Sequence, residues 1–387
     1  MHQRRRVVAA GAATIAIFLA VQVGALALVG PFESAGYRAV ENPSNPANSA
    51  IYLGAILVAT AVMLGTIKLG ADWVLRGFVI LSAGFVSLYV FSVLLPAPLG
   101  WSVAGIATSP LALAAAGLLA GALLFYPEWY VIDAAGIVMG AGAAALFGIS
   151  FGLLPAIVLL VALAVYDAIS VYGTEHMLAL ADGVMDLKLP VVLVIPLTLS
   201  YSFLDESPST AEDSDGRAVE ADGGEPSETR LASSDERGEV RPEGAPRNSE
   251  RQGRERSESD GGDDAATDET ADANSDGDDA AERPGLDERE ALFVGLGDAV
   301  MPGVMVASAA VFAPASPLVT GFALTLPALT AMIGTICGLV ALLWFVMQGR
   351  AHAGLPLLNG GAVGGYLLGA LAAGIPLVRA VGLGPYV

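Results

Sequence analysis

The stretch Leu292-Phe293-Val294-Gly295-Leu296-Gly297-Asp298-Ala299-Val300-Met301 decides the fold. It belongs to an apolar segment, about 290–313, that is long enough to cross a bilayer, and we expect Asp298 about eight residues inside it. A second apolar segment, about 151–180, carries Asp167 in the same way. A charged side chain at the centre of a membrane helix costs about 2.5–3.5 kcal/mol. Two such carboxylates, each in an otherwise apolar run, therefore indicate a functional site inside a membrane protein.

The composition is that of a membrane protein, because nearly all of the net charge lies in one segment and the rest of the chain is apolar. Hydrophobic residues make up 54% of the 387, and charged residues only 15%, against roughly 25% in soluble domains. The segment from Tyr201 to Glu290 holds 29 of the 39 acidic and 10 of the 19 basic residues, which accounts for almost all of the net charge of −20. The rest of the chain is a nearly neutral apolar body, and its single cysteine, Cys337, excludes an internal disulfide framework.

Nine apolar segments predict an all-α membrane protein with nine transmembrane helices. The first follows the basic cluster Met1–Arg6 and runs for about 24 residues, longer than the apolar core of roughly 7–15 residues in a signal peptide. The others lie at about 51–67, 73–95, 103–125, 130–149, 151–180, 290–313, 317–347 and 355–375. Segment 317–347 is long for one helix and contains Pro317 and Pro327, so we expect it to begin as an external loop or to kink.

The basic residues predict the orientation of these helices. Arg4, Arg5 and Arg6 place the N-terminus in the cytoplasm. Helix six then delivers the long acidic loop to the cytoplasm, and an odd number of helices leaves the C-terminus outside. Glu128 and Asp133 fall at an expected membrane interface, where we expect both to be solvated.

The predicted helices divide the chain into four regions. Residues 1–180 form an N-terminal six-helix membrane region with Asp167, and 290–387 form a C-terminal three-helix membrane region with Asp298. Residues 181–203 extend helix six and include a possible substrate-pairing strand. Residues 204–289 are expected to be a disordered loop, because this acidic stretch has almost no aromatic or β-branched residues to bury. Its acid content, with two lysines against seventeen arginines in the whole chain, is compatible with a halophile.

Two chemistries fit a pair of membrane aspartates. Facing carboxylates hold one proton between them, and aspartyl proteases use such a pair to activate water without a metal or another cofactor. The same residues would also serve as a relay in a transporter or a proton or cation conduit. Inverted repeats would favour transport, and we find no convincing internal repeat. Spacing alone does not show that Asp167 meets Asp298, and basic clusters with interleaved aromatics, which would indicate nucleic acid as a partner, are absent.

The motifs around both aspartates resemble a known family. Tyr166-Asp167 and Gly295-Leu296-Gly297-Asp298 are similar to the paired motifs of the presenilin and signal-peptide-peptidase family of intramembrane aspartyl proteases. The stretch 165–196 is most similar to the archaeal presenilin-like branch. The resemblance implies that Asp167 and Asp298 are catalytic. It also implies hydrolysis of peptide bonds within transmembrane segments of membrane proteins or remnant signal peptides, with no cofactor or metal.

The third motif of this family is Pro-Ala-Leu at the start of the ninth helix, beside the aspartates. Pro327-Ala328-Leu329 matches it literally but falls in the eighth segment. Pro356-Leu357-Leu358 opens the ninth segment on the expected cytoplasmic side and departs from the motif only at Leu357. We choose Pro356-Leu357-Leu358, with Tyr166 and Gly295-Leu296-Gly297, as the residues that shape the site.

A further stretch is a candidate for contact with substrate. Leu189–Pro196 is apolar, β-branched and bracketed by prolines. A transmembrane helix must unwind before its backbone can be cut, because all its amides are hydrogen-bonded. We hypothesise that Val191, Val192, Leu193 and Val194 form an edge strand that pairs with the unwound substrate. The alternative is a membrane-skimming anchor.

Overall fold

The described part of the protein is built almost entirely from helices. The computed structural model describes residues 2–95, 101–103, 105–173, 192–197, 291–348 and 353–384, all in one compact unit, Met1–Pro208 with Arg283–Val387. The helices are α1 (His2–Ser34), α2 (Ala47–Lys68), α3 (Asp72–Leu94), α4 (Pro110–Phe125), α5 (Trp129–Ser150), α6 (Leu153–Gly173), α8 (Leu296–Phe312), α9 (Leu326–Met347), α10 (Gly354–Ala372) and α11 (Leu377–Ala380). The strands are β1 (Trp101–Val103), β2 (Ile106–Thr108), β3 (Val192–Pro196), β4 (Ala291–Gly295), β5 (Pro317–Val319) and β6 (Phe322–Thr325).

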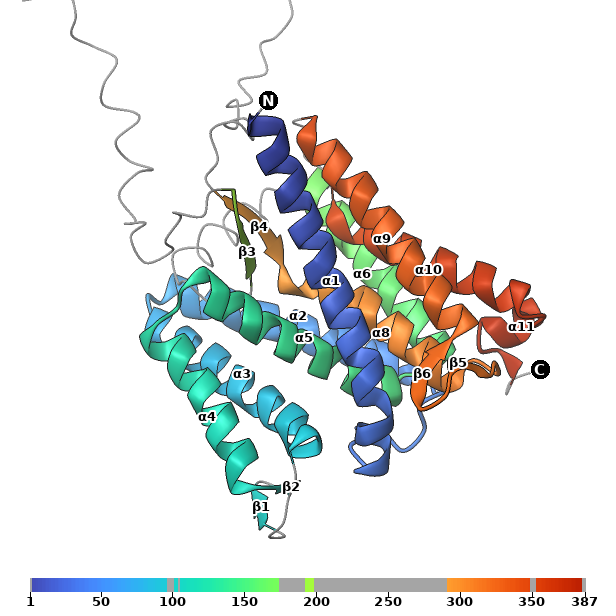
Figure 1. Cartoon of the computed structure of the whole chain (residues 1–387), viewed down its shortest axis with the longest axis horizontal. Coiled ribbons are helices and arrows are strands. Elements are labelled where there is room, and N and C mark those ends of the chain that lie inside the picture. Colours follow the sequence, from blue (N-terminus) through green and yellow to red (C-terminus); the bar gives the residue numbers. More distant parts are fainter. Residues whose placement is uncertain are drawn as a thin grey trace, which may run out of the picture. The chain divides into compact units, whose positions relative to one another are not determined.

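The predicted all-α membrane fold is confirmed. Among the described helices, seven are long and apolar enough to cross a membrane, and α4 and α8 are shorter apolar helices. Together they account for the nine apolar segments of the sequence (Figure 1). The expected disordered loop, 204–289, lies outside the described residues, and the boundaries proposed around it stay predictions.

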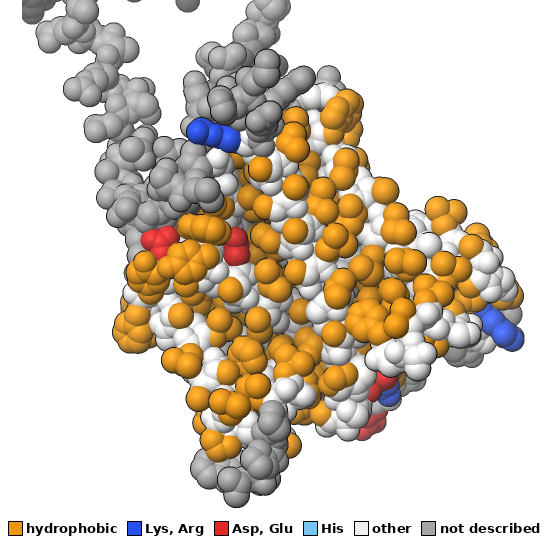
Figure 2. All heavy atoms as spheres, viewed as in Figure 1, with side chains coloured by type: hydrophobic (Ala, Val, Ile, Leu, Met, Phe, Trp, Pro, Cys, Tyr) orange, Lys and Arg blue, Asp and Glu red, His pale blue; other side chains and the backbone are white. Residues whose placement is uncertain are grey.

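The outside of the bundle is apolar. Hydrophobic side chains cover most of the visible face of the described residues (Figure 2). Leu81 on α3, Leu118 on α4 and Phe125 at the end of α4 are 72–82% exposed. Exposed apolar surface on this scale is typical of a face that meets lipid, which agrees with a multi-pass membrane protein.

Helix α5 lies at the centre of the bundle and packs against α1, α3 and α8. Small residues allow this close packing. A Cβ added at Gly148 would collide with Ala307 of α8, and one added at Gly24 of α1 would lie 2.8 Å from the Cβ of Ala141. The sequence of α5 is therefore constrained by its neighbours on several sides.

Short strand pairs replace three pieces of the predicted helices. Strands β1 and β2 form a hairpin before α4, and β5 and β6 form another before α9. Segment 317–347 therefore begins as a hairpin, and Pro327 stands in the first turn of α9 rather than at a kink. Gly321 makes the β5–β6 turn with a φ of 80°, a conformation that glycine adopts at little cost.

The third pair corrects the predicted position of Asp298. Residues 291–295 form β4, which pairs antiparallel with β3 over five residues, from Val192 opposite Gly295 to Pro196 opposite Ala291. Helix α8 starts only at Leu296, so Asp298 stands in its first turn and not about eight residues inside a helix. The prediction was wrong because a short apolar run has the same hydropathy in a strand as in a helix.

Helices α9 and α10 form the closest helix pair in the described bundle. Cβ atoms added at Gly334 or Gly365 would collide with backbone carbonyls of the facing helix, those of Gly361 and Thr330. The glycines let the two backbones touch, as small residues do in membrane helix packing.

Replacing one of these glycines should loosen the pair. An added methyl at Gly361 would collide with the Gly334 carbonyl, whereas the Cβ site at Gly360 has nothing within 4 Å. We expect Gly361→Ala to lower the free energy of unfolding by about 1–3 kcal/mol. Gly360→Ala is the matched control and should leave it equal or slightly higher, because alanine favours a helix. Thermal unfolding in detergent micelles measures both, and equal midpoints would contradict the packing.

Candidate active site

Asp167 is the buried carboxylate of α6. It is only 7% exposed, and its Oδ2 accepts a hydrogen bond of 3.0 Å from the backbone N–H of Leu355. The amide of Gly354 also hydrogen-bonds to this carboxylate. Both donors belong to the first turn of α10, whose amides have no acceptor within their own helix. Asp167 therefore supplies, from another helix, the acceptor that a capping side chain normally provides.

Asp298 lies at the same helix end. Its Oδ2 would lie 3.3 Å from a Cβ added at Gly295 and 3.6 Å from one added at Gly354. The carboxylate is thus held between the last residue of β4 and the first residue of α10. Because Gly354 contacts both aspartates, the structure brings Asp167 and Asp298 together at the N-terminus of α10, close enough for their charges to interact.

The residues before Asp298 differ in what surrounds them. A side chain at Gly295 would press against the Asp298 carboxylate, whereas Gly297 is exposed and its Cβ site has nothing within 4 Å. Leu296 is buried against α5, where a Cβ added at Gly140 would lie 3.3 Å from its Cδ1. Leu296 therefore anchors the start of α8, and Gly297 leaves open space beside Asp298.

The two candidate proline motifs lie near opposite ends of α10, because Pro356 stands in its first turn and Pro327, in the first turn of α9, lies beside its far end. Pro356 follows directly after the residues that bind Asp167. Leu357 presents its carbonyl to Gly338 of α9, and Leu358 is fully buried. Pro327 instead faces Gly369, near the far end of the helix. Gly369 lies 15 residues after Gly354 in the same helix. At about 1.5 Å per residue, Pro327 is therefore roughly 22 Å from the start of α10, where the aspartates meet.

The other predicted site residues are placed as follows. Tyr166 is 45% exposed, so its side chain leaves α6 in a different direction from that of Asp167. Val192, Leu193 and Val194 lie in β3, whose partner β4 leads directly into α8 and Asp298. Val191 lies outside the described residues. No group of three His, Cys, Asp or Glu residues that could hold a metal ion occurs in the described parts of the chain.

Sequence reasoning misplaced two acidic residues near the start of α5. Glu128 and Asp133 were expected to be solvated, but they are only 6% and 8% exposed. Asp133 Oδ1 accepts a hydrogen bond of 2.8 Å from the N–H of Val194. The sequence does hold one signal for this, because Asp133 is the single charged residue of α5. The amides of Gly354 and Leu355 were missed because backbone donors carry no side-chain signature.

The chain matches a protein-family model over most of its length. The model is described as signal-peptide peptidase, presenilin aspartyl protease, and it covers residues 15–223 and 263–375. The protein belongs to this family. The matched ranges include Asp167, Asp298 and Pro356.

Two solved structures described as a presenilin family intramembrane aspartate protease are similar to this member of the family. One, in space group C222, has 29% identity and a TM-score of 0.56, and the match covers 94% of this chain and 99% of that one. The other, in space group P2, has 30% identity and a TM-score of 0.53, with 93% and 96% covered. No curated protein matches the chain. The protein is an intramembrane aspartyl protease, and nothing favours the transporter alternative.

Proposed function

We propose that Asp167 and Asp298 are the catalytic pair of this protease. The observation that carries the proposal is their convergence on Gly354, in a bundle with an apolar exterior. Two carboxylates this close share one proton at low cost, whereas two full charges would repel each other. A pair with a single proton has both a base and an acid available at the same moment.

The hydrogen bonds support different roles for the two residues. Asp167 receives backbone N–H groups at a helix N-terminus, and both features favour its charged form. We therefore assign Asp167 as the base and Asp298 as the acid. Asp167 takes a proton from water, the hydroxide oxygen bonds to the scissile carbonyl carbon, and Asp298 donates its proton to the carbonyl oxygen. Asp167 then passes its proton to the amide nitrogen, Asp298 takes a proton from one hydroxyl of the tetrahedral intermediate, and the C–N bond breaks, so that Asp167 is again ionised and Asp298 again protonated.

Neighbouring motif residues shape this site in the proposal. Gly297 leaves room beside Asp298 for the backbone of a substrate, and Leu296 fixes the start of α8. Pro356 has no N–H of its own, so the first turn of α10 offers its donors from Gly354 and Leu355. Leu357 and Leu358 hold that turn against α9 and the core, and Tyr166 forms part of the outward surface beside the site.

The substrates of this protease lie in the membrane. We propose that they are transmembrane helices of proteins, or remnant signal peptides, that unwind locally before cleavage. The β3–β4 sheet supports this, because it ends three residues before Asp298 and offers extended backbone for an unwound segment. In this proposal Val192, Leu193 and Val194 belong to the strand pair on which the substrate docks.

Each aspartate should be indispensable. We expect Asp167→Ala and Asp298→Ala each to lower kcat by at least about a thousandfold, because neither carboxylate can do the work of both. The assay uses purified protein in detergent with a fluorogenic transmembrane peptide, with and without a transition-state inhibitor of aspartyl proteases. Gly360→Ala, whose Cβ site has nothing within 4 Å, is the control for purification and folding. Cleavage by either alanine variant at the wild-type rate would refute the assignment.

The strand pair should be needed for cleavage. Leu193 stands opposite Val294, and its N–H faces β4, since the N–H of the next residue, Val194, points to Asp133. Leu193→Pro removes this N–H and with it a hydrogen bond between β3 and β4, so we expect cleavage to be lost while the protein is still made. Leu193→Val keeps the ladder and should cleave at least about tenfold faster than the proline variant. The same peptide assay reports this, and equal rates would remove the sheet from the mechanism.

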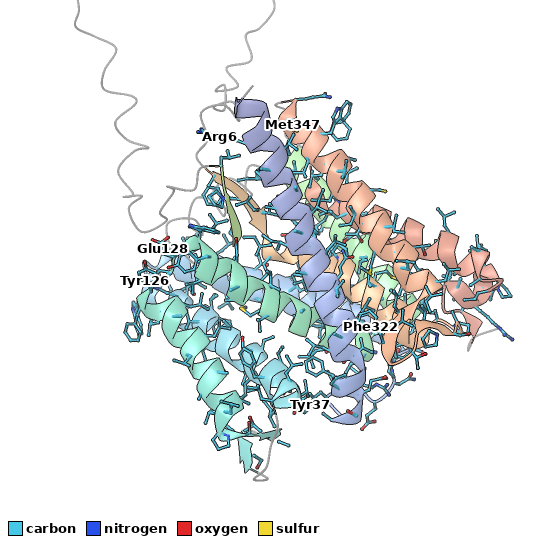
Figure 3. All side chains as sticks on the ribbon, viewed as in Figure 1. Arg6, Tyr37, Tyr126, Glu128, Phe322 and Met347 are labelled. Atoms are coloured by element: carbon cyan, nitrogen blue, oxygen red, sulfur yellow. The ribbon has the colours of Figure 1, made fainter. Side chains whose placement is uncertain are left out.

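We also propose a sidedness for this multi-pass membrane protein. Arg6 and Met347 lie at one end of the bundle, the end toward which β3 ends and β4 starts, and Tyr37 and Phe322 lie at the other (Figures 1 and 3). The basic N-terminus supports a cytoplasmic location for the first end, for the active site and for the loop 204–289, with the C-terminus outside.

Limited proteolysis tests this orientation. A soluble protease such as trypsin, added to inside-out vesicles that contain the protein, should cut the loop 204–289, and the same enzyme added to right-side-out vesicles should not. The reverse pattern would invert the orientation.

A further inference from the structure

Asp133 is a buried carboxylate that the proposed catalytic chemistry does not use. It stands in the second turn of α5, is 8% exposed and is the single charged residue of that helix. Burying a carboxylate costs free energy unless hydrogen bonds replace the water it loses. The described hydrogen bond that meets this need at Asp133 comes from β3.

The bond identifies which edge of β3 Asp133 occupies. In an antiparallel pair, the N–H groups of alternate residues face the partner strand and those between them face away. Val194 stands opposite Phe293 of β4, yet its N–H is donated to Asp133 Oδ1 at 2.8 Å. This amide therefore points away from β4, and the carboxylate oxygen accepts it as the carbonyl of a third strand would.

Helix α5 runs along the same edge. Val194 packs with Ile132 and Ala135 of α5, and on the other face of the strand Leu193 meets the same helix. A Cβ added at Gly136 would lie only 2.7 Å from Leu193 Cδ2. A third strand would need a spacing of about 4.7–4.9 Å from β3, and α5 already fills that space.

The same contacts lead to the active site. Strand β3 fixes β4 over five paired residues, and β4 passes into α8 at Leu296. Leu296 is itself held by α5, because its Cδ1 would lie 3.6 Å from a Cβ added at Gly136. Asp298 follows two residues later. A shift of β3 along α5 would therefore move the strand pair relative to the carboxylates.

We propose that Asp133 is a positioning residue of the protease. By accepting the Val194 N–H it holds β3 against α5, which already occupies that edge of the strand, and so fixes the register of the sheet against Asp298. The proposal rests on the proposed function, because register matters only if substrate docks on this sheet. Its consequence is that Asp133 determines which peptide bond of the substrate reaches the catalytic pair.

The test compares Asp133→Leu, which has no acceptor, with Asp133→Asn, which keeps the Oδ1 acceptor at the same place. Kinetics and mass spectrometry of the cleaved transmembrane peptide are measured for both. We expect Asp133→Leu to lower kcat by about tenfold to a hundredfold and to shift or broaden the cleavage positions. Asp133→Asn should cleave at the wild-type positions with kcat within about threefold of wild type.

Two further variants separate positioning from loss of stability. Val194→Pro removes the donor of the same bond and leaves the β4 ladder in place, so it should reproduce the shifted positions even if Asp133→Leu fails to fold. Ser308→Ala removes another buried hydrogen bond, from the Ser308 hydroxyl to the Phe151 carbonyl at 2.8 Å. It should leave the positions unchanged whatever its stability.

Wild-type cleavage positions in both Asp133→Leu and Val194→Pro would overturn the inference, and so would an Asp133→Asn variant that behaves like Asp133→Leu. Failure of the proposed function gives a different result. Asp298→Ala would still cleave the peptide if the catalytic pair were wrong, and Leu193→Pro would cleave as fast as Leu193→Val if the substrate did not dock on the sheet.

Discussion

The start of α10 is the constraint on which the site depends. A helix begins with amides that have no acceptor within it, and inside a membrane no bulk water supplies one. Asp167 meets this need from α6 by accepting the N–H of Leu355 at 3.0 Å. One interaction thus satisfies a backbone donor, stabilises a buried carboxylate and fixes the position of one of the two aspartates of the site. Asp298 is then placed against the same turn through Gly354.

The approach of so many elements to one helix end requires small residues. Glycines bring α9 into backbone contact with α10, and other small residues let α5 lie closely against α1 and α8. Without water to drive apolar helices together, packing of this kind is a main source of their association in lipid. The geometry of the carboxylates is therefore determined largely by residues that have no chemistry of their own.

The small β3–β4 sheet leads directly into the helix that carries Asp298. Strands are rare among membrane helices because their edges leave backbone groups without partners. Here β4 covers one edge of β3, and Asp133 with α5 covers the other. Strand β3 is thus covered on both edges, and the sheet lies directly before Asp298 in the chain.

The sequence by itself determined the apolar helices and the two carboxylates among them, because hydropathy and charge are local properties. It also favoured Pro356 over Pro327, since orientation follows from basic residues and the order of the helices. It misjudged residues 291–295, which are a strand, and Asp133, which is buried. Only the tertiary structure decided these, and only it brought Asp167 to Leu355 across 188 positions of sequence. Strand pairing, burial and the meeting of distant residues depend on partners that no local pattern identifies.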